Sequence, residues 1–301
     1  MKVLVVCSGN SGFISPFIKE QVDSLEKLNV VIDYFFIKGR GFFGYLKNYI
    51  FLIRKINEYS PDLIHAHYGL SGLLASIQRK VAVVITFHGS DINRKRNVIF
   101  SYCASILSTQ NIFVHPNYPK QLNTMRPYNI MPCGINLKIF FPMEKHKARE
   151  KIGLDKKGIY GLFSSHFTNK VKNYPLAKKA IESTGKNIKI IELAGYNREQ
   201  VKILLNAVDF LLMTSLSEGS PQVIKEALAC NCPVISTDVG DVKSITEKID
   251  NCFITSYDPN EISEKIKTLL ASGLRSNGRF FMESYGLDKV AKKVKNVYDS
   301  I

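Results

Sequence analysis

Two glutamates, Glu218 and Glu226, enclose the segment of this chain whose residue types are best suited to binding a ligand. The intervening Gly219-Ser220-Pro221 predicts a helix start, because serine caps the free N–H groups of a first turn and proline is tolerated at the first helical position. Gln222 then lies four residues before Glu226, on one face of the expected helix. The sequence therefore predicts a helix N-terminus surrounded by acidic and amide side chains.

These groups suit an anionic ligand that also carries many hydroxyls. The backbone N–H groups of Gly219, Ser220 and Gln222, reinforced by the helix dipole, suit phosphate oxygens. The carboxylates of Glu218 and Glu226 only accept hydrogen bonds, so they repel phosphate but bind vicinal hydroxyls of a sugar or a ribose. An ordinary capped helix with one exposed glutamate fits the spacing equally well.

Two apolar runs must hold this helix start in place. Phe210 to Met213 and Pro233 to Ile235 are expected to be buried strands, and the helix between them turns Val223, Ile224, Ala227 and Leu228 toward a core. A strand, a helix and a second strand form a βαβ unit, in which ligands bind beyond the carboxyl ends of the strands. The glutamates are therefore expected at that edge of a parallel sheet.

The chain resembles glycosyltransferase family 4, whose members are retaining enzymes of the GT-B fold. The resemblance rests on the spacing of Glu218 and Glu226, on the continuation Ala227 to Ile235, and on Lys172-Asn173-Tyr174-Pro175, which is most similar to bacterial capsule and teichuronic-acid-type members. It implies an α/β protein with two Rossmann-like parallel-sheet domains facing across a cleft. Residues 1–142 would be the acceptor-side domain, 143–286 the nucleotide-sugar-binding domain, and 287–301 a helix that crosses back to the first domain.

Composition agrees with two soluble domains. A chain of 301 residues is long enough for two cores, and its 45% hydrophobic and 22% charged residues are typical of a globular protein. No run of about eighteen apolar residues predicts a membrane span. Met1-Lys2 leads directly into Val3 to Cys7, which is too short for a signal-peptide core. We therefore expect a cytoplasmic protein.

The cysteines are expected to be buried thiols rather than metal ligands. The Cys230-Asn231-Cys232 pair has no second cysteine or histidine pair at zinc-ligand spacing. Most of the six lie inside apolar runs: Cys7, Cys103, Cys133, Cys230, Cys232 and Cys252.

A net charge of +15 predicts phosphate-rich partners. Nucleic acid is disfavoured among them, because the chain has no basic helix of a known motif and no aromatic RNA-binding signature. A helix expected from Tyr45 to Tyr59 combines aromatic residues with cations, which suits an anionic membrane surface, although a core helix with a solvated basic face fits nearly as well. The lipid-linked acceptor implied by the resemblance favours peripheral attachment to the inner face of the plasma membrane. The cations concerned are Arg40, Lys47, Arg54 and Lys55.

The first half contributes a glycine loop and three histidines. Gly12 lies in a small-residue loop between a strand at Val3 to Cys7 and a helix, where backbone N–H groups can approach a phosphate, and an ordinary turn is the competing interpretation. His65 and His67 are two apart on a strand and therefore share a side, as a metal pair or as structural, site-lining residues. His88 follows the strand Val81 to Phe87, and the resemblance implies that it meets the donor sugar near the reacting carbon. A charged segment, residues 93–97, could face an acidic acceptor, although solvation alone would account for its charges.

The second half contributes the groups that the resemblance assigns to the donor diphosphate and base. Lys172 matches the family's lysine, but His166 occupies the position of its usual arginine, so His166 or Lys170 would have to substitute. Tyr196 follows a strand expected from Ile188 to Leu193, at the turn where the family's nucleotide base often packs.

The expected reaction is transfer of a glycosyl group from a nucleotide-sugar, with a UDP-sugar favoured, to a glycan or lipid-linked acceptor. Lys172, the helix start at Ser220 and the Gly12 loop would stabilise the leaving diphosphate. Glu218 would orient the donor sugar, Glu226 the ribose and His88 the reacting face, with retention of configuration, and with no metal, cofactor or covalent nucleophile. Two alternatives remain at this stage: a nucleotide-sugar 2-epimerase of the same fold, and a catalytically silent GT-B partner subunit.

Overall fold

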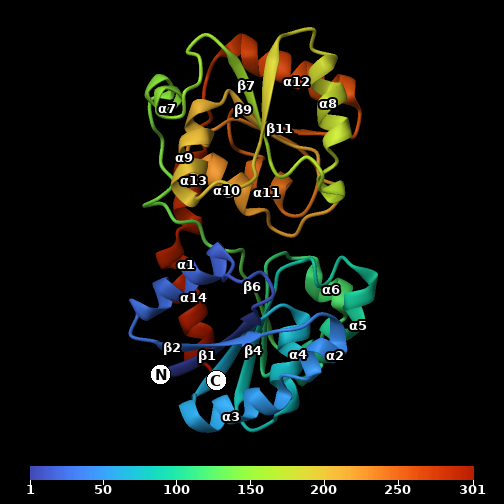
Figure 1. Cartoon of the computed structure of the whole chain (residues 1–301), viewed down its shortest axis with the longest axis vertical. Helices are drawn as coiled ribbons and strands as arrows, with labels where there is room; N and C mark the ends of the chain where they lie inside the picture. The colour runs from blue at the N-terminus through green and yellow to red at the C-terminus, as the bar shows by residue number, and fades with distance from the viewer. The chain divides into compact units, whose positions relative to one another are not determined.

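The chain folds into two compact units in a computed structural model that describes the backbone of all 301 residues and every side chain except those of Lys95 and Arg96. The first unit comprises Met1–Gly134 with Leu287–Ile301, and the second comprises Ile135–Gly286 (Figure 1). Two of the cations in the charged segment 93–97 therefore lie outside the described side chains, and the acceptor contact predicted for that segment stays a prediction.

The first unit is a parallel sheet of six strands in the order β2-β1-β3-β4-β5-β6. Its strands are β1 (Lys2–Ser8), β2 (Val31–Ile37), β3 (Leu63–His67), β4 (Ala82–Phe87), β5 (Gln110–Phe113) and β6 (Tyr128–Ile130). Its helices are α1 (Pro16–Glu26), α2 (Gly41–Leu46), α3 (Tyr49–Tyr59), α4 (Gly69–Ile77), α5 (Lys95–Leu107), α6 (Tyr118–Leu122) and α14 (Leu287–Asp299). The order reverses beside β1, as in nucleotide-binding α/β folds.

Helices cover both faces of this sheet, because alternate side chains of each strand point to opposite faces. Leu4 and Val6 of β1 pack with α3, α4, α5 and α6, whereas Val3 and Val5 pack with α1 and α14 (Figure 1). Helix α14 contributes Val290, Val294, Val297 and Tyr298 to that second layer. The C-terminal segment is thus part of the first unit's core.

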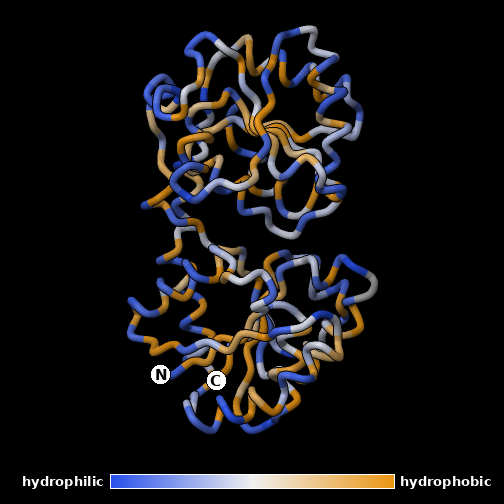
Figure 2. The backbone as a smooth tube through the Cα atoms, in the orientation of Figure 1, coloured by the Kyte–Doolittle hydropathy of each residue, from blue (hydrophilic) through white to orange (hydrophobic). Residues whose placement is uncertain are grey.

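The second unit is a parallel sheet of five strands in the order β11-β10-β9-β7-β8. Its strands are β7 (Ile159–Phe163), β8 (Ile188–Glu192), β9 (Phe210–Met213), β10 (Val234–Thr237) and β11 (Cys252–Thr255). Its α-helices are α7 (Lys145–Lys151), α8 (Tyr174–Glu182), α9 (Arg198–Ala207), α10 (Gln222–Ala229), α11 (Val242–Thr246), α12 (Pro259–Ser272) and α13 (Gly278–Met282). Figure 2 shows that the most apolar stretches of the chain run through the strands at the middle of each sheet. The predicted α/β class with two parallel-sheet, Rossmann-like domains is confirmed.

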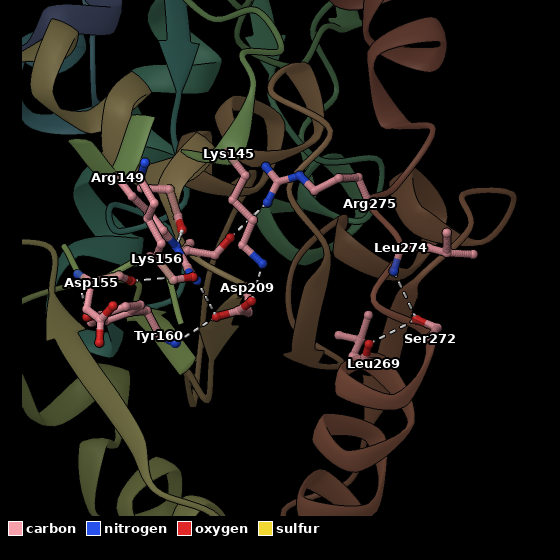
Figure 3. A network of polar contacts seen from close by, with 12 residues as sticks. Lys145, Arg149, Asp155, Lys156, Tyr160, Asp209, Leu269, Ser272, Leu274 and Arg275 are labelled. Atoms are coloured by element: carbon pink, nitrogen blue, oxygen red, sulfur yellow. Dashed lines mark hydrogen bonds and ion pairs between the residues drawn. The ribbon is translucent and has the colours of Figure 1, made fainter. Parts of the chain in front are cut away.

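A buried ion-pair network anchors α7 to the second sheet (Figure 3). The Asp209 carboxylate pairs with Arg149 at 2.9 Å and with Lys145, and it accepts the N–H of Tyr160 at 2.7 Å. Arg149 is 2% exposed and also donates to the carbonyls of Ala207 and Lys156. Because a buried charge is stable only when it is paired and hydrogen-bonded, this network has a structural role.

The boundary between the units differs from the sequence-based one. Residues 135–142 were assigned to the first domain, but the structure places them in the second. Ile135 donates its N–H to Tyr285 at 2.9 Å, and Phe140 is fully buried in the second unit's core. The division therefore falls at Gly134, before the first side chain that packs on the second sheet.

The helix expected from Tyr45 to Tyr59 is two helices. Asn48 separates α2 from α3, because its amide donates to the carbonyls of Gly44 and Lys38 while its side-chain oxygen accepts the N–H of Lys38 at 3.2 Å. An asparagine that bonds the backbone in this way competes with continuation of a helix. Helix α9 was not predicted at all, although Asn197 and Gln200 form a capping box at its start.

Candidate active site

The loop that follows β9 is fixed to the short 3-10 helix Lys170–Lys172, which follows β7 by six residues. Leu216 donates its N–H to the Val171 carbonyl at 2.8 Å. The Thr214 hydroxyl lies 3.0 Å from the carbonyl oxygens of both Lys172 and Asn173. Because β7 and β9 are parallel neighbours, their two loops meet at the carboxyl edge of the sheet, where α/β proteins bind ligands.

Lys172 and Glu218 form an ion pair at this edge. The lysine Nζ lies 2.6 Å from the Glu218 Oε1, and the two side chains are 17% and 15% exposed. Partial burial strengthens their attraction and keeps both groups in one place. The pair joins a cation that suits a diphosphate with a carboxylate that suits sugar hydroxyls.

Glu226 forms a second ion pair, with Arg198 at the start of α9. The Glu226 side chain is 6% exposed, and the guanidinium of Arg198 lies 4.5 Å from the centre of the Phe140 ring. Arg198 was missed in the sequence because α9 was missed. The capping-box pattern of Asn197 and Gln200 was the signal that places Arg198 in a helix's first turn.

Ser220 does not cap the helix, which corrects the sequence-based interpretation. Helix α10 begins at Gln222, and Pro221 occupies the cap position without a side-chain hydrogen bond. The Ser220 hydroxyl instead lies 2.5 Å from the Asp241 carboxylate and accepts a hydrogen bond from Lys225 at 2.7 Å. Asp241 follows β10, and Lys225 lies within α10. The residues next to Ser220 in the sequence therefore did not reveal these two partners.

Lys225 is fully buried beneath the loop and was also missed. Its ammonium donates to the side chains of Ser220 and Gln222, the latter at 3.1 Å. A buried ammonium with several acceptors is an anchor, because any loop movement would strip it of partners. Lys225 therefore fixes the backbone that follows Glu218.

Two glycines meet where the loop passes the end of β10. Asp241 donates its N–H to the Gly219 carbonyl at 3.1 Å. Gly240 has a φ of +58°, and a Cβ there would lie 2.3 Å from the Gly219 oxygen. Only glycine fits such an approach in a left-handed conformation. The close approach sets the direction in which Glu218 leaves the loop.

The remaining donor-side candidates lie at the same edge but outside these pairs. His166 is 56% exposed, with its Nδ1 3.5 Å from Glu192 and 2.9 Å from the Thr168 hydroxyl. Tyr196 is 41% exposed and follows Gly195, whose φ is +78°. In the described hydrogen bonds and ion pairs, neither residue contacts Lys172 or Glu218.

In the first unit, His88 lies directly after β4 in a cluster of aromatic and polar side chains. Its Nε2 lies 3.0 Å from Nδ1 of His67, and its Nδ1 lies 3.5 Å from the Cys133 sulfur. The rings of Tyr68 and Phe17 have centroids 4.6 and 5.0 Å away. The side chain of His88 is thus held on several sides at the carboxyl edge of the first sheet.

His65 and His67 share one side of β3, as predicted, with ring centroids 4.4 Å apart. Both are buried, and His65 contacts the Tyr298 hydroxyl at 2.6 Å and the Thr86 hydroxyl at 2.7 Å. Burial lowers the pKa of His65 to about 3. Burial, and then the neighbouring His65 and His88, hold the pKa of His67 well below its usual value. Both imidazoles are therefore neutral at pH 7.

Asp91 holds the turn that carries His88. Its two carboxylate oxygens accept the N–H groups of Gly89 at 2.8 Å and Gly69 at 3.0 Å, which joins the turn to the start of α4. Burial raises the pKa of this carboxyl to about 6, and the backbone hydrogen bonds oppose that shift. The acid is a positioning group rather than a ligand contact.

The Gly12 loop is exposed at the carboxyl end of β1. Gly12 has a φ of +79°, which favours glycine, and nothing lies within 4 Å of a Cβ built there. Asn10 fixes the loop by exchanging two hydrogen bonds with the backbone of Gly39, at 2.7 and 2.8 Å. The loop has space for a ligand, but the described contacts do not identify one.

Metal-binding groups are not assembled in the described part of the chain. Among the side chains that the structure describes, no three histidine, cysteine or acidic residues are placed to hold a metal ion. All six cysteines are free thiols, and Cys7, Cys230 and Cys232 are buried. Burial raises the pKa of the Cys7 thiol to about 11, so it is not a thiolate at neutral pH. In the described residues, no helix has the length and apolarity to cross a bilayer.

Two family models cover most of the chain. Residues 2–110 match a glycosyl transferase 4-like model, and residues 171–272 match a model of glycosyl transferases group 1. The chain therefore belongs to the group 1 glycosyltransferases with a 4-like N-terminal domain, and it is an enzyme. The resemblance seen at Glu218, Glu226 and Lys172 is thereby confirmed at the level of the family.

Curated relatives carry the same activity in their names. An uncharacterized glycosyltransferase of Methanocaldococcus jannaschii is 28% identical over 80% of this chain and 76% of the relative. TuaC of Bacillus subtilis, assigned to teichuronic acid biosynthesis, is 28% identical over 70% of this chain and 62% of its own length. A Campylobacter jejuni N,N'-diacetylbacillosaminyl-diphospho-undecaprenol alpha-1,3-N-acetylgalactosaminyltransferase is 25% identical over 91% and 86%.

Solved structures establish the fold. Sucrose-phosphate synthase of Thermosynechococcus elongatus matches with a TM-score of 0.86 at 16% identity, over 99% of this chain and 98% of the other. Anabaena HepE, solved in complex with UDP-glucose, matches with a TM-score of 0.78 at 16% identity over the full length of both chains. The protein thus has the GT-B fold expected from the sequence. A UDP-GlcNAc 2-epimerase of Methanocaldococcus jannaschii also matches, with a TM-score of 0.65 at 14% identity over all of both chains, so fold alone does not separate the two activities.

Proposed function

We propose that this glycosyltransferase moves a hexose from a UDP-sugar to a glycan or lipid-linked acceptor in bacterial surface polysaccharide synthesis, with retention of configuration. The names of TuaC and of the Campylobacter transferase support the acceptor class, and the UDP-glucose complex of HepE supports the donor class. The second unit binds the donor, and the first unit contributes the acceptor side.

The observation that carries this proposal is the Lys172–Glu218 pair at the carboxyl edge of the second sheet. A diphosphate offers Lys172 a better partner than one carboxylate, because it carries more negative charge and several acceptor oxygens. Glu218, once released, accepts hydrogen bonds from the sugar hydroxyls. The incoming donor therefore replaces one ion pair with two contacts, one between its diphosphate and Lys172 and one between its sugar hydroxyls and Glu218.

The leaving diphosphate is stabilised by protein cations without a metal ion. Lys172 is held in place before the donor arrives, since the carbonyls on both sides of it are tied to Thr214 and to Leu216. Preorganised charge of this kind lowers the cost of forming the diphosphate anion in the transition state. His166 and Lys170 lie close by in the sequence to supplement it.

Glu226 orients the ribose, and Arg198 holds its carboxylate in place through the ion pair. Tyr196 packs against the base, as its exposed position after β8 allows. In the first unit, His88 meets the transferred sugar, and the neutral imidazole of His67 fixes the His88 ring through the contact at 3.0 Å.

Helices α2 and α3 are proposed as the face that meets an anionic membrane. Phe43 is 76% exposed and Ile50 is 64% exposed, which is costly in water and favourable at a lipid interface. Arg40, Lys47 and Arg54 are exposed in the same segment, whereas Lys55 pairs with Asp33 at 2.5 Å. The protein would then act from the cytoplasm as a peripheral membrane enzyme.

A panel of nucleotide-sugars tests the donor assignment. Thermal shift and hydrolysis assays should select one UDP-sugar, and Glu226→Ala should abolish the shift. Glu264→Ala is the matched control, because Glu264 has a 68% exposed side chain on α12 and should bind donor normally. Donor turnover without any acceptor and with inversion at C2 would instead identify an epimerase, and no stabilisation by any nucleotide would contradict donor binding altogether.

Vesicle co-sedimentation tests the membrane face. The double variant Phe43→Ser, Ile50→Ser should lose binding to phosphatidylglycerol vesicles. Phe280→Ser removes a 75% exposed phenylalanine from the second unit and should bind as the wild type does. Equal binding by all three proteins would contradict the assignment of α2 and α3.

A further inference from the structure

A polar pocket of about 220 Å³ lies at the amino edge of the first sheet, away from the candidate active site. It is lined by the end of α4, by residues 79–83 at the start of β4, by residues 107–109 before β5, and by Arg126 before β6. His67 and His88 lie at the other ends of β3 and β4. Because β4 has six residues, the two edges are roughly 20 Å apart.

The pocket is positively charged. Three of its ten lining residues are the cations Arg79, Lys80 and Arg126, and none of the ten is acidic. All three cations are exposed, so a solute can reach them. Asp62 starts the neighbouring strand but does not line the pocket, and its carboxylate accepts the N–H of Lys2 at 2.6 Å. The expected occupant is therefore an anion.

Backbone carbonyls at the end of α5 fix the side chains of the two arginines, Arg79 and Arg126. Arg79 donates from Nη1 to the Leu107 carbonyl at 2.5 Å, and Arg126 donates from Nε to the Ile106 carbonyl at 2.8 Å. A guanidinium has five N–H donors, and the described hydrogen bonds use one on each arginine. The other donors can bind a tetrahedral oxyanion, and prior fixing of the side chains reduces the entropy lost on binding.

Ser76 lies behind the wall of the pocket. Its residue is 1% exposed, and its hydroxyl is shielded from solvent and has no hydrogen-bond partner among the described residues. An anion in the pocket would therefore contact the three cations rather than this hydroxyl.

We propose that this pocket, formed around Arg79, Lys80, Thr109 and Arg126, binds a phosphate group. The phosphate belongs to a soluble phosphorylated molecule or to a lipid headgroup, since both present the same oxyanion to the same donors. The site is independent of the donor site and does not rest on the proposed function.

Calorimetric titration with inorganic phosphate tests the site. Lys80→Glu should weaken binding about tenfold or more, because it reverses one of three charges and no described contact gives its ammonium a structural role. Ser76→Ala should leave binding unchanged, because the hydroxyl is buried behind the pocket wall. The double variant Arg79→Gln, Arg126→Gln should abolish binding. Because that variant also removes two contacts to α5, its loss of binding could reflect a local structural change, so Lys80→Glu is the decisive variant.

Two controls separate this site from other anion sites. Lys172→Gln removes a cation at the candidate donor site and should leave the phosphate affinity of the pocket unchanged. Lys27→Gln removes an exposed charge from α1 and should also have no effect. Phosphate binding that is lost in Lys172→Gln and retained in Lys80→Glu would overturn the proposal.

Vesicles identify the source of the phosphate. If the ligand is a lipid headgroup, Lys80→Glu should reduce binding to phosphatidylglycerol vesicles severalfold while leaving binding to neutral phosphatidylcholine vesicles unchanged. If the ligand is soluble, inorganic phosphate should bind and Lys80→Glu should not alter vesicle binding. A Lys80→Glu protein that matches the wild type in both assays would refute the pocket as a phosphate site.

Discussion

At the carboxyl edge of the first sheet the two buried histidines of β3 are neutral, whereas at the same edge of the second sheet two carboxylates are ion-paired. His65 and His67 are buried and uncharged, and they contact hydroxyls or one another. Lys172 and Arg198 instead pair with Glu218 and Glu226. Burial keeps these two imidazoles uncharged, whereas each of the two carboxylates has a cation as its partner.

A diphosphate needs fixed positive charge, and Lys172 and Arg198 at the second edge are cations that can exchange a carboxylate partner for a phosphate. A sugar and its acceptor hydroxyl need oriented dipoles, which neutral histidines supply without attracting phosphate. Four predictions test this division of labour.

The largest effect is expected for Lys172→Ala. Loss of the preorganised cation should lower kcat/KM by about 100-fold to 1000-fold, the range found when one transition-state charge contact is removed. Steady-state kinetics with the selected donor measure it. Lys178→Ala is the control, because Lys178 is an exposed lysine on α8, and it should change the rate less than about twofold. Equal effects of the two variants would remove Lys172 from the site.

Next in size is the loss of stability from Lys225→Met. The variant removes the buried donor that bonds the Ser220 hydroxyl and the Gln222 side chain, which should cost about 1–3 kcal/mol of stability. Urea denaturation should show the second unit destabilised. Lys243→Met alters an exposed lysine on α11 and should stay within about 0.5 kcal/mol of the wild type. A Lys225→Met protein as stable as this control would show that the buried lysine is not an anchor.

A smaller effect is expected for Arg198→Gln, which leaves Glu226 without its paired cation. Donor affinity should fall by about tenfold, because the carboxylate loses the cation that orients it. A double-mutant cycle with Glu226→Gln should show strong coupling between the two residues in calorimetric donor binding. Additive effects would mean that the ion pair plays no part in holding the ribose.

The last prediction is the pH dependence of stability that His65 contributes. Its folded-state pKa of about 3 lies below the ordinary 6.5, so its contribution to stability is present above pH 6.5 and is lost as pH falls toward 3. The loss should be about 1.4 kcal/mol per pH unit within that window. Asp91 acts in the opposite sense between about pH 6 and 4, because its pKa is raised to about 6.

The difference between wild type and His65→Gln isolates the histidine, since both proteins retain Asp91. Denaturation at pH 7.5, 6 and 5 should show that the variant loses less stability on acidification. Parallel pH profiles of the two proteins would indicate that His65 has the same pKa in the folded and the unfolded chain, which would contradict its burial as a neutral group.

Local pattern predicted most of the fold. Apolar runs such as Val3 to Cys7 and Phe210 to Met213 lie within or coincide with observed strands β1 and β9, and the alternation of His65 and His67 predicted their shared side. These features depend on neighbours in the sequence. The break at Asn48 and the loss of the Ser220 cap depend on hydrogen bonds to other segments, so propensity alone gave the wrong local structure.

The candidate site was predicted by residue type but not by partner. Glu226 and Lys172 were identified from spacing and resemblance, yet their pairing with Arg198 and Glu218 arises only when separate βα loops meet at one edge of the sheet. Lys225 had a helical position but no sequence signal of its burial. A local sequence pattern does not indicate which distant element supplies a partner. The capping box of Asn197 and Gln200 is a local pattern, and it would have predicted α9.

A crystal structure with the selected nucleotide-sugar bound tests the central claim most directly. We predict that Lys172 Nζ then lies within hydrogen-bonding distance of a diphosphate oxygen, while the Glu218 carboxylate has left it and accepts a hydroxyl of the sugar. A bound donor whose diphosphate lies elsewhere, with the Lys172–Glu218 pair intact, would contradict the account.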